Sequence, residues 1–138
     1  MATRFPEMER HPLRILLIEN DTVDATWLEQ LIKERCSTSE VVHRASLPDA
    51  FAALAQQQID TVFVSIRPEG EIPSIRECDE IVRRAGTRPV VVLINATETA
   101  LVPEIRATGV KFVYRKHPIW RTAQIRKQEL RDKFRSGA

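Results

Sequence analysis

Three short, uninterrupted apolar runs constrain this sequence more than any other feature. Residues Ile15–Ile18, Val62–Val64 and Val90–Ile94 contain no polar side chain. A strand with one face in water alternates apolar and polar residues, whereas a strand buried on both faces does not. Runs this short are also better suited to strands than to helices. They are therefore predicted to be central strands of a parallel sheet that helices cover on both faces.

Amphipathic segments between and after these runs predict helices. The expected helices cover residues 22–36, 46–58, 72–86, 98–109 and about 118–135. Ser46 and Asp49 can form a capping box at the second helix, and Gly86 and Gly109 are typical helix stops. The apolar stripe expected on the second helix consists of Phe51, Leu54 and Ala55.

Two further short strands, over residues 40–45 and 110–114, complete five strand–helix units. Right-handed crossovers and short loops favour a doubly wound sheet. The predicted fold is therefore a flavodoxin-like (βα)5 three-layer α/β sandwich with strand order 2-1-3-4-5. We expect one domain over residues 13–135, an arm before it and a tail or the start of a linker over 136–138.

Composition excludes several classes of protein. Hydrophobic residues make up 43% of the 138 residues and charged residues 29%, which is typical of a globular domain. Cys36 and Cys78 belong to no CxxC or Cys/His set, so neither a disulfide framework nor structural zinc is expected. The polar start lacks a signal-peptide core, and the run Val90–Ile94 is too short to cross a bilayer. A cytoplasmic protein without a membrane span is predicted.

The charge is unevenly distributed along the chain. Residues 115–138 contain eight Lys/Arg and two Asp/Glu, a balance of +6, although the whole chain carries only +2. Such a segment can be the solvated face of a last helix, or it can bind nucleic acid, acidic lipid or an acidic protein. No helix-turn-helix or zinc-finger pattern supports nucleic-acid binding by this domain alone.

Polar residues follow several of the predicted strands. Glu19 follows the first apolar run, Ser65 the second, and Lys116 lies just beyond the last strand. The carboxyl ends of parallel strands are where open α/β sheets bind ligands. A serine hydroxyl needs a neighbouring base to act as a nucleophile, and no histidine or G-x-S-x-G motif lies near Ser65 in sequence. An enzyme is therefore not expected.

Three motifs in this order resemble the receiver domain of bacterial response regulators, the CheY-like family. They are "ILLIEND" over residues 15–21, a polar residue 45 positions after Asn20, and "GVKFVYRKHP" over 109–118. The resemblance covers residues 13–135 and implies a role in two-component signal transduction. In that family two acids hold Mg²⁺, an aspartate accepts phosphate, and a hydroxyl and a lysine contact the phosphate.

The residues at the family's functional positions differ from that pattern. Glu19 matches the first acid and Lys116 the lysine, but Asn20 takes the place of the second acid and Asp21 follows one position late. Ser65 takes the place of the phosphoacceptor. The hydroxyl position falls on Ile94 or Asn95, depending on the anchor used for counting. The resemblance therefore implies a degenerate phosphorylation pocket, a pseudo-receiver that uses no metal, cofactor or aspartyl phosphate.

We expect Lys116, with Arg67, to pair with the remaining acids and neutralise them permanently; the alternative is that Arg67 is solvated in its loop. The family implies a face for a protein partner or for dimerisation, formed by the fourth helix, fifth strand and fifth helix. Its candidate residues are Leu101, Ile105, Tyr114, Leu130 and Phe134.

Three alternatives to a phosphorylation-independent interaction module stay open. Ser65 or Asp21 could accept phosphate in a residual switch. Leu130 and Phe134 could fold back on their own core instead of meeting a partner. The domain could also regulate a larger protein with a nucleic-acid or cyclic-nucleotide output. A dinucleotide site is disfavoured because the loop over residues 19–24 has no glycine.

Overall fold

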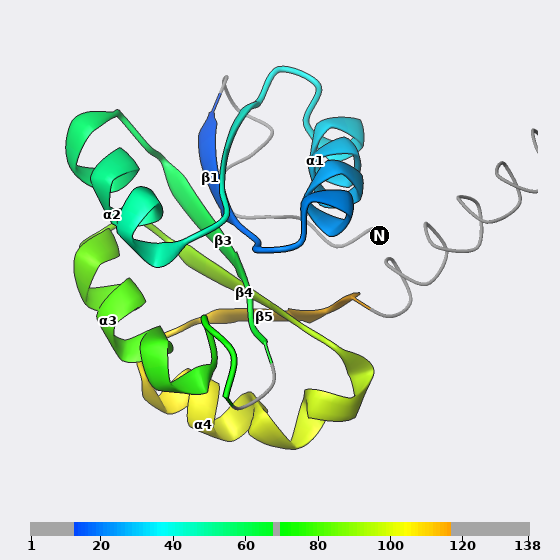
Figure 1. The fold of residues 1–138 in the computed structure, drawn as a ribbon, viewed down its shortest axis with the longest axis vertical. Helices are drawn as coiled ribbons and strands as arrows, with labels where there is room; N and C mark the ends of the chain where they lie inside the picture. The colour runs from blue at the N-terminus through cyan, green and yellow to red at the C-terminus, as the bar shows by residue number, and fades with distance from the viewer. Residues whose placement is uncertain (1–12, 68–69, 117–138) are drawn as a thin grey trace, which may run out of the picture.

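Five parallel strands form one sheet in the order β2-β1-β3-β4-β5, which confirms the predicted topology (Figure 1). The structure is a computed structural model that describes residues 13–67 and 70–116, without the side chains of residues 96 and 97. The strands are β1 (Arg14–Ile18), β2 (Glu40–Arg44), β3 (Thr61–Ser65), β4 (Val90–Ile94) and β5 (Phe112–Arg115). Ile18 pairs with Val64 and Ser65 with Leu93, so the carboxyl ends of the three central strands lie level.

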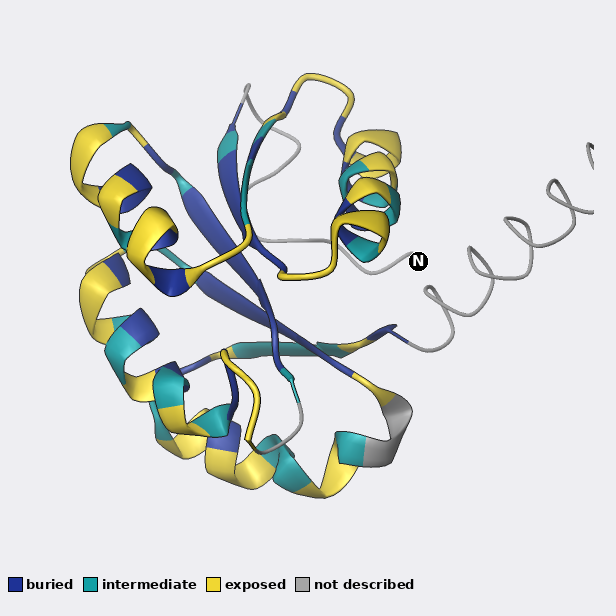
Figure 2. Ribbon diagram, viewed as in Figure 1, coloured by how far each residue is buried: buried dark blue, intermediate teal, exposed yellow. Residues whose placement is uncertain are grey.

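The described helices lie on both faces of the sheet (Figure 1). Helix α1 (Thr22–Arg35) covers one face, and α2 (Leu47–Gln56), α3 (Ile75–Ala85) and α4 (Val102–Ala107) cover the other. Alternate strand residues enter two separate cores: Val62 and Val64 pack with α2–α4, whereas Phe63 packs with α1. All residues of β3 and β4 and residues Ile15–Ile18 of β1 are buried (Figure 2), as the uninterrupted apolar runs predict.

Side chains fix the starts of the helices that surround the sheet's carboxyl edge. The Asp21 carboxylate accepts hydrogen bonds from the backbone N–H of Val23 at 2.9 Å and Asp24 at 3.0 Å, which caps α1. Ser74 caps α3, and its own N–H donates to the Glu77 carboxylate at 2.7 Å. A cap of this kind contributes about 1 kcal/mol. These two helices therefore begin at defined residues beside the strand ends.

The structure differs from the expected helices in two places. The single helix expected over 98–109 is a 3₁₀ helix, η1 (Ala96–Leu101), followed by α4. Pro103 explains the break, because proline has no N–H to donate to the preceding turn and suits the first turn of a new helix. Ala55 is exposed on α2, and the buried residues there are Leu47, Ala50, Ala53 and Leu54. A cap expected at Ser46 is present, with Asp49 N–H donating to its hydroxyl at 3.3 Å.

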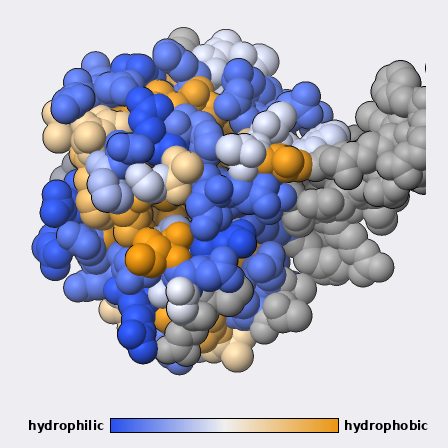
Figure 3. Space-filling model, viewed as in Figure 1, coloured by the Kyte–Doolittle hydropathy of each residue, from blue (hydrophilic) through white to orange (hydrophobic). Residues whose placement is uncertain are grey.

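Hydrophilic residues dominate the face of the molecule drawn in Figure 3, and smaller apolar patches lie among them. Within residues 13–67 and 70–116, no helix is long and apolar enough to cross a membrane. The expected arm, last helix and tail fall outside the described residues.

Candidate functional site

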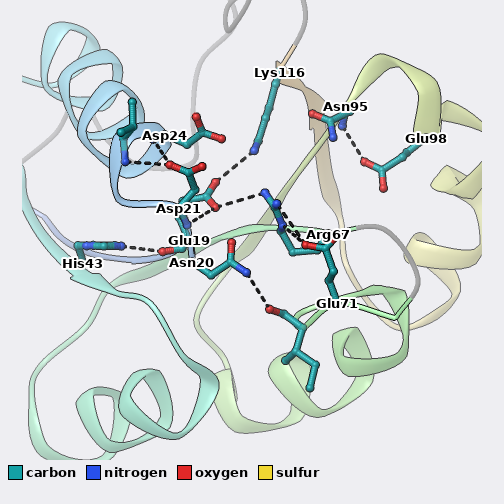
Figure 4. Close-up of polar contacts among 12 residues, drawn as sticks. Glu19, Asn20, Asp21, Asp24, His43, Arg67, Glu71, Asn95, Glu98 and Lys116 are labelled. Atoms are coloured by element: carbon teal, nitrogen blue, oxygen red, sulfur yellow. Dashed lines mark hydrogen bonds and ion pairs between the residues drawn. The ribbon is translucent and has the colours of Figure 1, made fainter.

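A buried carboxylate, Glu19, is the centre of the polar cluster at the carboxyl edge of the sheet (Figure 4). Glu19 is the residue after β1, and its side chain is fully buried. The Lys116 ammonium donates to Oε1 at 3.2 Å, and the Arg67 guanidinium lies 3.7 Å from Oε2. Oε2 also accepts the backbone N–H of Asp21 at 3.1 Å. Both carboxylate oxygens therefore already have partners within the chain.

The two cations come from the ends of different strands. Lys116 follows β5, and its side chain is only 3% exposed. Arg67 lies two residues beyond β3, and it also pairs with Glu71 at 3.3 Å. A buried charge is tolerated only when an opposite charge and hydrogen bonds compensate its lost hydration. The predicted pairing of Lys116 and Arg67 with an acid is thus present, and Arg67 is not simply solvated.

Ser65, at the end of β3, is fully buried and its hydroxyl has no hydrogen-bond partner among the described residues. Ile18 pairs with Val64, so Ser65 and Glu19 are the next residues of neighbouring strands, and each lies two residues after a member of the core under α1, Phe63 and Leu17. A buried hydroxyl without a partner costs about 1–3 kcal/mol. A hydroxyl that neither reaches solvent nor contacts a base is a poor nucleophile.

The side chains of the two residues after Glu19 form hydrogen bonds to the backbone of the chain. Asn20 is exposed, and its amide nitrogen donates to the carbonyl of Ile72 at 3.4 Å. Asp21 is exposed and serves as the cap of α1. Across the described part of the chain, no group of three His, Cys, Asp or Glu residues is placed to hold a metal ion.

The two candidates for the family's hydroxyl position point to different places. Ile94 is fully buried and packs in the core under α2–α4. Asn95 is exposed, and its backbone N–H donates to the Glu98 carboxylate at 3.0 Å. The side chains of Ile94 and Asn95 both lack a hydroxyl.

Asp24 and His43 also belong to this cluster, although neither was predicted as a site residue from the sequence. Burial raises the pKa of Asp24, and the charges of Asp21 and Glu19 raise it further, while Lys116 and Arg67 act against this. The imidazole Nε2 of His43 lies 2.8 Å from the carbonyl oxygen of Glu19, so we assign the proton to that nitrogen. The usable sequence signal was the place of Asp24 in the first turn of the helix that follows Glu19.

The raised pKa of Asp24 predicts a pH-dependent stability. The folded state holds the Asp24 proton more tightly than the unfolded chain, so the ionised carboxylate destabilises the fold once pH exceeds its ordinary value. Asp24→Asn removes this penalty. We expect the stability of the variant relative to wild type to rise between about pH 4 and neutrality. Urea unfolding across that range measures it; a difference independent of pH would contradict the prediction.

The residues expected on a partner face separate into two groups. Leu101 and Tyr114 are half-buried, each packed against one of the cores. Ile105 is fully buried on the inner side of α4, so its assignment to an exposed face is wrong. Helix α4 is short, and Ile105 and Val102 are its only branched aliphatic residues. Ile105 therefore has to face the sheet if α4 is to cover it. Leu130 and Phe134 lie outside the described residues.

Comparison with known proteins gives the fold. No protein-family model matches the sequence, and no curated protein does. A receiver domain protein of Methanospirillum hungatei is 14% identical with a TM-score of 0.63, over 91% of this chain and 98% of its own. Chemotaxis response regulator CheY4 of Vibrio cholerae is 13% identical with a TM-score of 0.63, over 85% and 97%. A response regulator of Thermotoga maritima is 20% identical with a TM-score of 0.64, over 78% and 86%.

These identities are low, so the likeness establishes the fold alone. The chain has the flavodoxin-like fold of response-regulator receiver domains, with the same sheet order and helices between the strands.

Proposed function

We propose that this chain is a pseudo-receiver, a signal-transduction module that binds a protein partner or a second copy without aspartyl phosphorylation. The observation that carries the proposal is the pairing of Glu19 with two cations, 3.2 Å from Lys116 and 3.7 Å from Arg67. Under this proposal the domain is not an enzyme and is located in the cytoplasm.

The electrostatics of the cluster favour a constant state over a switch. Mg²⁺ binds proteins through carboxylate oxygens that are free to meet it. Here the oxygens of Glu19 accept hydrogen bonds from Lys116 and Asp21 and form an ion pair with Arg67, and Ser65 adds no carboxylate. A fixed guanidinium stands in for a metal charge, so no charge change is available to alter the neighbouring strand β5. The domain would therefore present one surface at all times.

The partner surface proposed for this module includes α4 and β5, where Leu101 and Tyr114 are half-buried. Leu130 and Phe134 from the end of the chain are proposed to extend it. Aromatic residues such as Tyr114 are enriched in protein interfaces. Ile105 supports this surface from beneath and does not contribute to it directly.

An amide NMR titration tests the proposal. We expect Mg²⁺, and then Mg²⁺ with beryllofluoride, to cause no saturable shift of the Asn20, Ser65 or Lys116 amides, because Glu19 is already neutralised. Sodium chloride at matched ionic strength controls for screening, which moves exposed amides without saturation. Saturable shifts that spread into β5 would mean that the pocket still binds a phosphoryl group, and the proposal would fail.

A further inference from the structure

A hollow of about 420 Å³ lies at the amino ends of β4 and β5. This is the opposite edge of the sheet from Glu19. Its wall is formed by the last turn of α3, the turn into β4 and the turn that leads from α4 into β5. The volume falls within the range of sites that hold small organic ligands. Neither the family resemblance nor the Glu19 cluster accounts for it.

The charge of the hollow has one sign. Arg88 and Lys111 line it, no acidic residue does, and neither cation forms an ion pair within the described residues. Arg88 is held by three backbone carbonyls: its Nε donates to Ile59 at 2.9 Å, and its Nη atoms donate to Ala85 at 3.1 Å and Leu54 at 3.3 Å. A guanidinium has five N–H donors, so these contacts leave two unused. The guanidinium is thus held beside Leu54, Ile59 and Ala85, none of which lines the hollow, and it keeps its charge near the wall.

Apolar groups form the rest of the wall. Val82, Pro89 and Phe112 line the hollow beside the two cations. Gly109 has φ +102°, and a Cβ atom there would lie 3.2 Å from Cγ1 of Val82. The positive φ and this tight contact both favour glycine at this position. A site with apolar walls and a few fixed polar groups is the usual form of a small-molecule pocket.

We infer that this hollow binds a small organic acid with an aromatic or branched aliphatic body. The acid group meets Lys111, with the positive charge of Arg88 nearby, and the body packs on Val82, Pro89 and Phe112. The inference does not depend on the proposed function, because it concerns the other edge of the sheet. It also predicts no effect of the ligand on the Glu19 cluster.

An amide NMR titration of the full chain with 1-naphthoate tests the inference. We expect saturable shifts of the amides of Gly86, Thr87, Gly109 and Lys111, whereas the Asn20 amide stays unchanged. Two matched probes separate the two halves of the ligand: acetate carries the acid without the body, and 1-naphthalenemethanol carries the body without the charge. Both should bind more weakly. If acetate matches 1-naphthoate, or if no shift saturates, the inference is overturned.

A pair of charge reversals locates the site. Lys111→Glu exchanges an attraction for a repulsion at the hollow and should weaken 1-naphthoate binding by about fivefold or more. Arg106→Glu makes the same change of charge on an exposed residue of α4 outside the lining, and it should change binding by less than about twofold. Equal weakening by both variants would mean that net charge alone attracts the probe, which would overturn the inference.

Discussion

Glu19→Gln is expected to lower the free energy of unfolding by about 3–5 kcal/mol, because it removes the negative charge that compensates the buried ammonium of Lys116. Urea unfolding at neutral pH, followed by circular dichroism, measures the change. The variant keeps the size and one oxygen of the side chain, so the effect reports the lost charge and not a cavity.

Glu71→Gln is the matched control for this prediction. Glu71 pairs with the same guanidinium, Arg67, but it is half exposed, and its loss should cost less than about 1 kcal/mol. The double variant Glu19→Gln, Lys116→Met removes both buried charges and should recover part of the lost stability. If Glu19→Gln costs no more than Glu71→Gln, the internal pairing does not support the fold as described.

Ile105→Ala is expected to cost about 3 kcal/mol, because a fully buried aliphatic side chain leaves a cavity when it is truncated. Leu101→Ala, on the half-buried turn just before α4, should cost about 1 kcal/mol. Thermal or urea unfolding of both variants gives the comparison. Equal costs would contradict the division between a core residue and a surface residue.

The same pair bears on the proposed partner surface. Light scattering of the folded variants should detect a change of association for Leu101→Ala if this surface joins two copies. Ile105→Ala, once folded, should keep the association state of the wild type. A change of association with Ile105→Ala alone would place the interface elsewhere.

The sheet could be predicted from the sequence because short segments of the chain reveal which strands are buried and where the helices end. Runs such as Val90–Ile94 reveal burial on both faces, and turn residues such as Gly86 mark the ends of helices. The strand order then follows from the handedness of the crossovers. Most of the polar cluster could also be predicted, because the carboxyl ends of parallel strands meet at one edge of the sheet.

Other parts of the cluster depend on distances that sequence spacing does not give. The approach of Asp24 to the charges of Glu19 and Lys116 depends on how the Asp21 cap orients the start of α1. The inward position of Ile105 depends on where Pro103 restarts the helix, since that sets which side of α4 faces the sheet. The capping box of Ser74 and Glu77 is a local S-x-x-E pattern from which the start of α3 can be predicted.

The double engagement of Arg67 limits the mutational paths open to this chain. A phosphorylatable pocket would need carboxylates at positions 20 and 65 and the departure of a guanidinium that now contacts both Glu19 and Glu71. Ser65→Asp alone adds a second buried carboxylate beside Glu19, and removal of Arg67 alone leaves Glu19 with less compensation. Each single substitution is expected to cost stability before a phosphorylatable pocket is complete. The effects of these substitutions are therefore expected to be strongly non-additive.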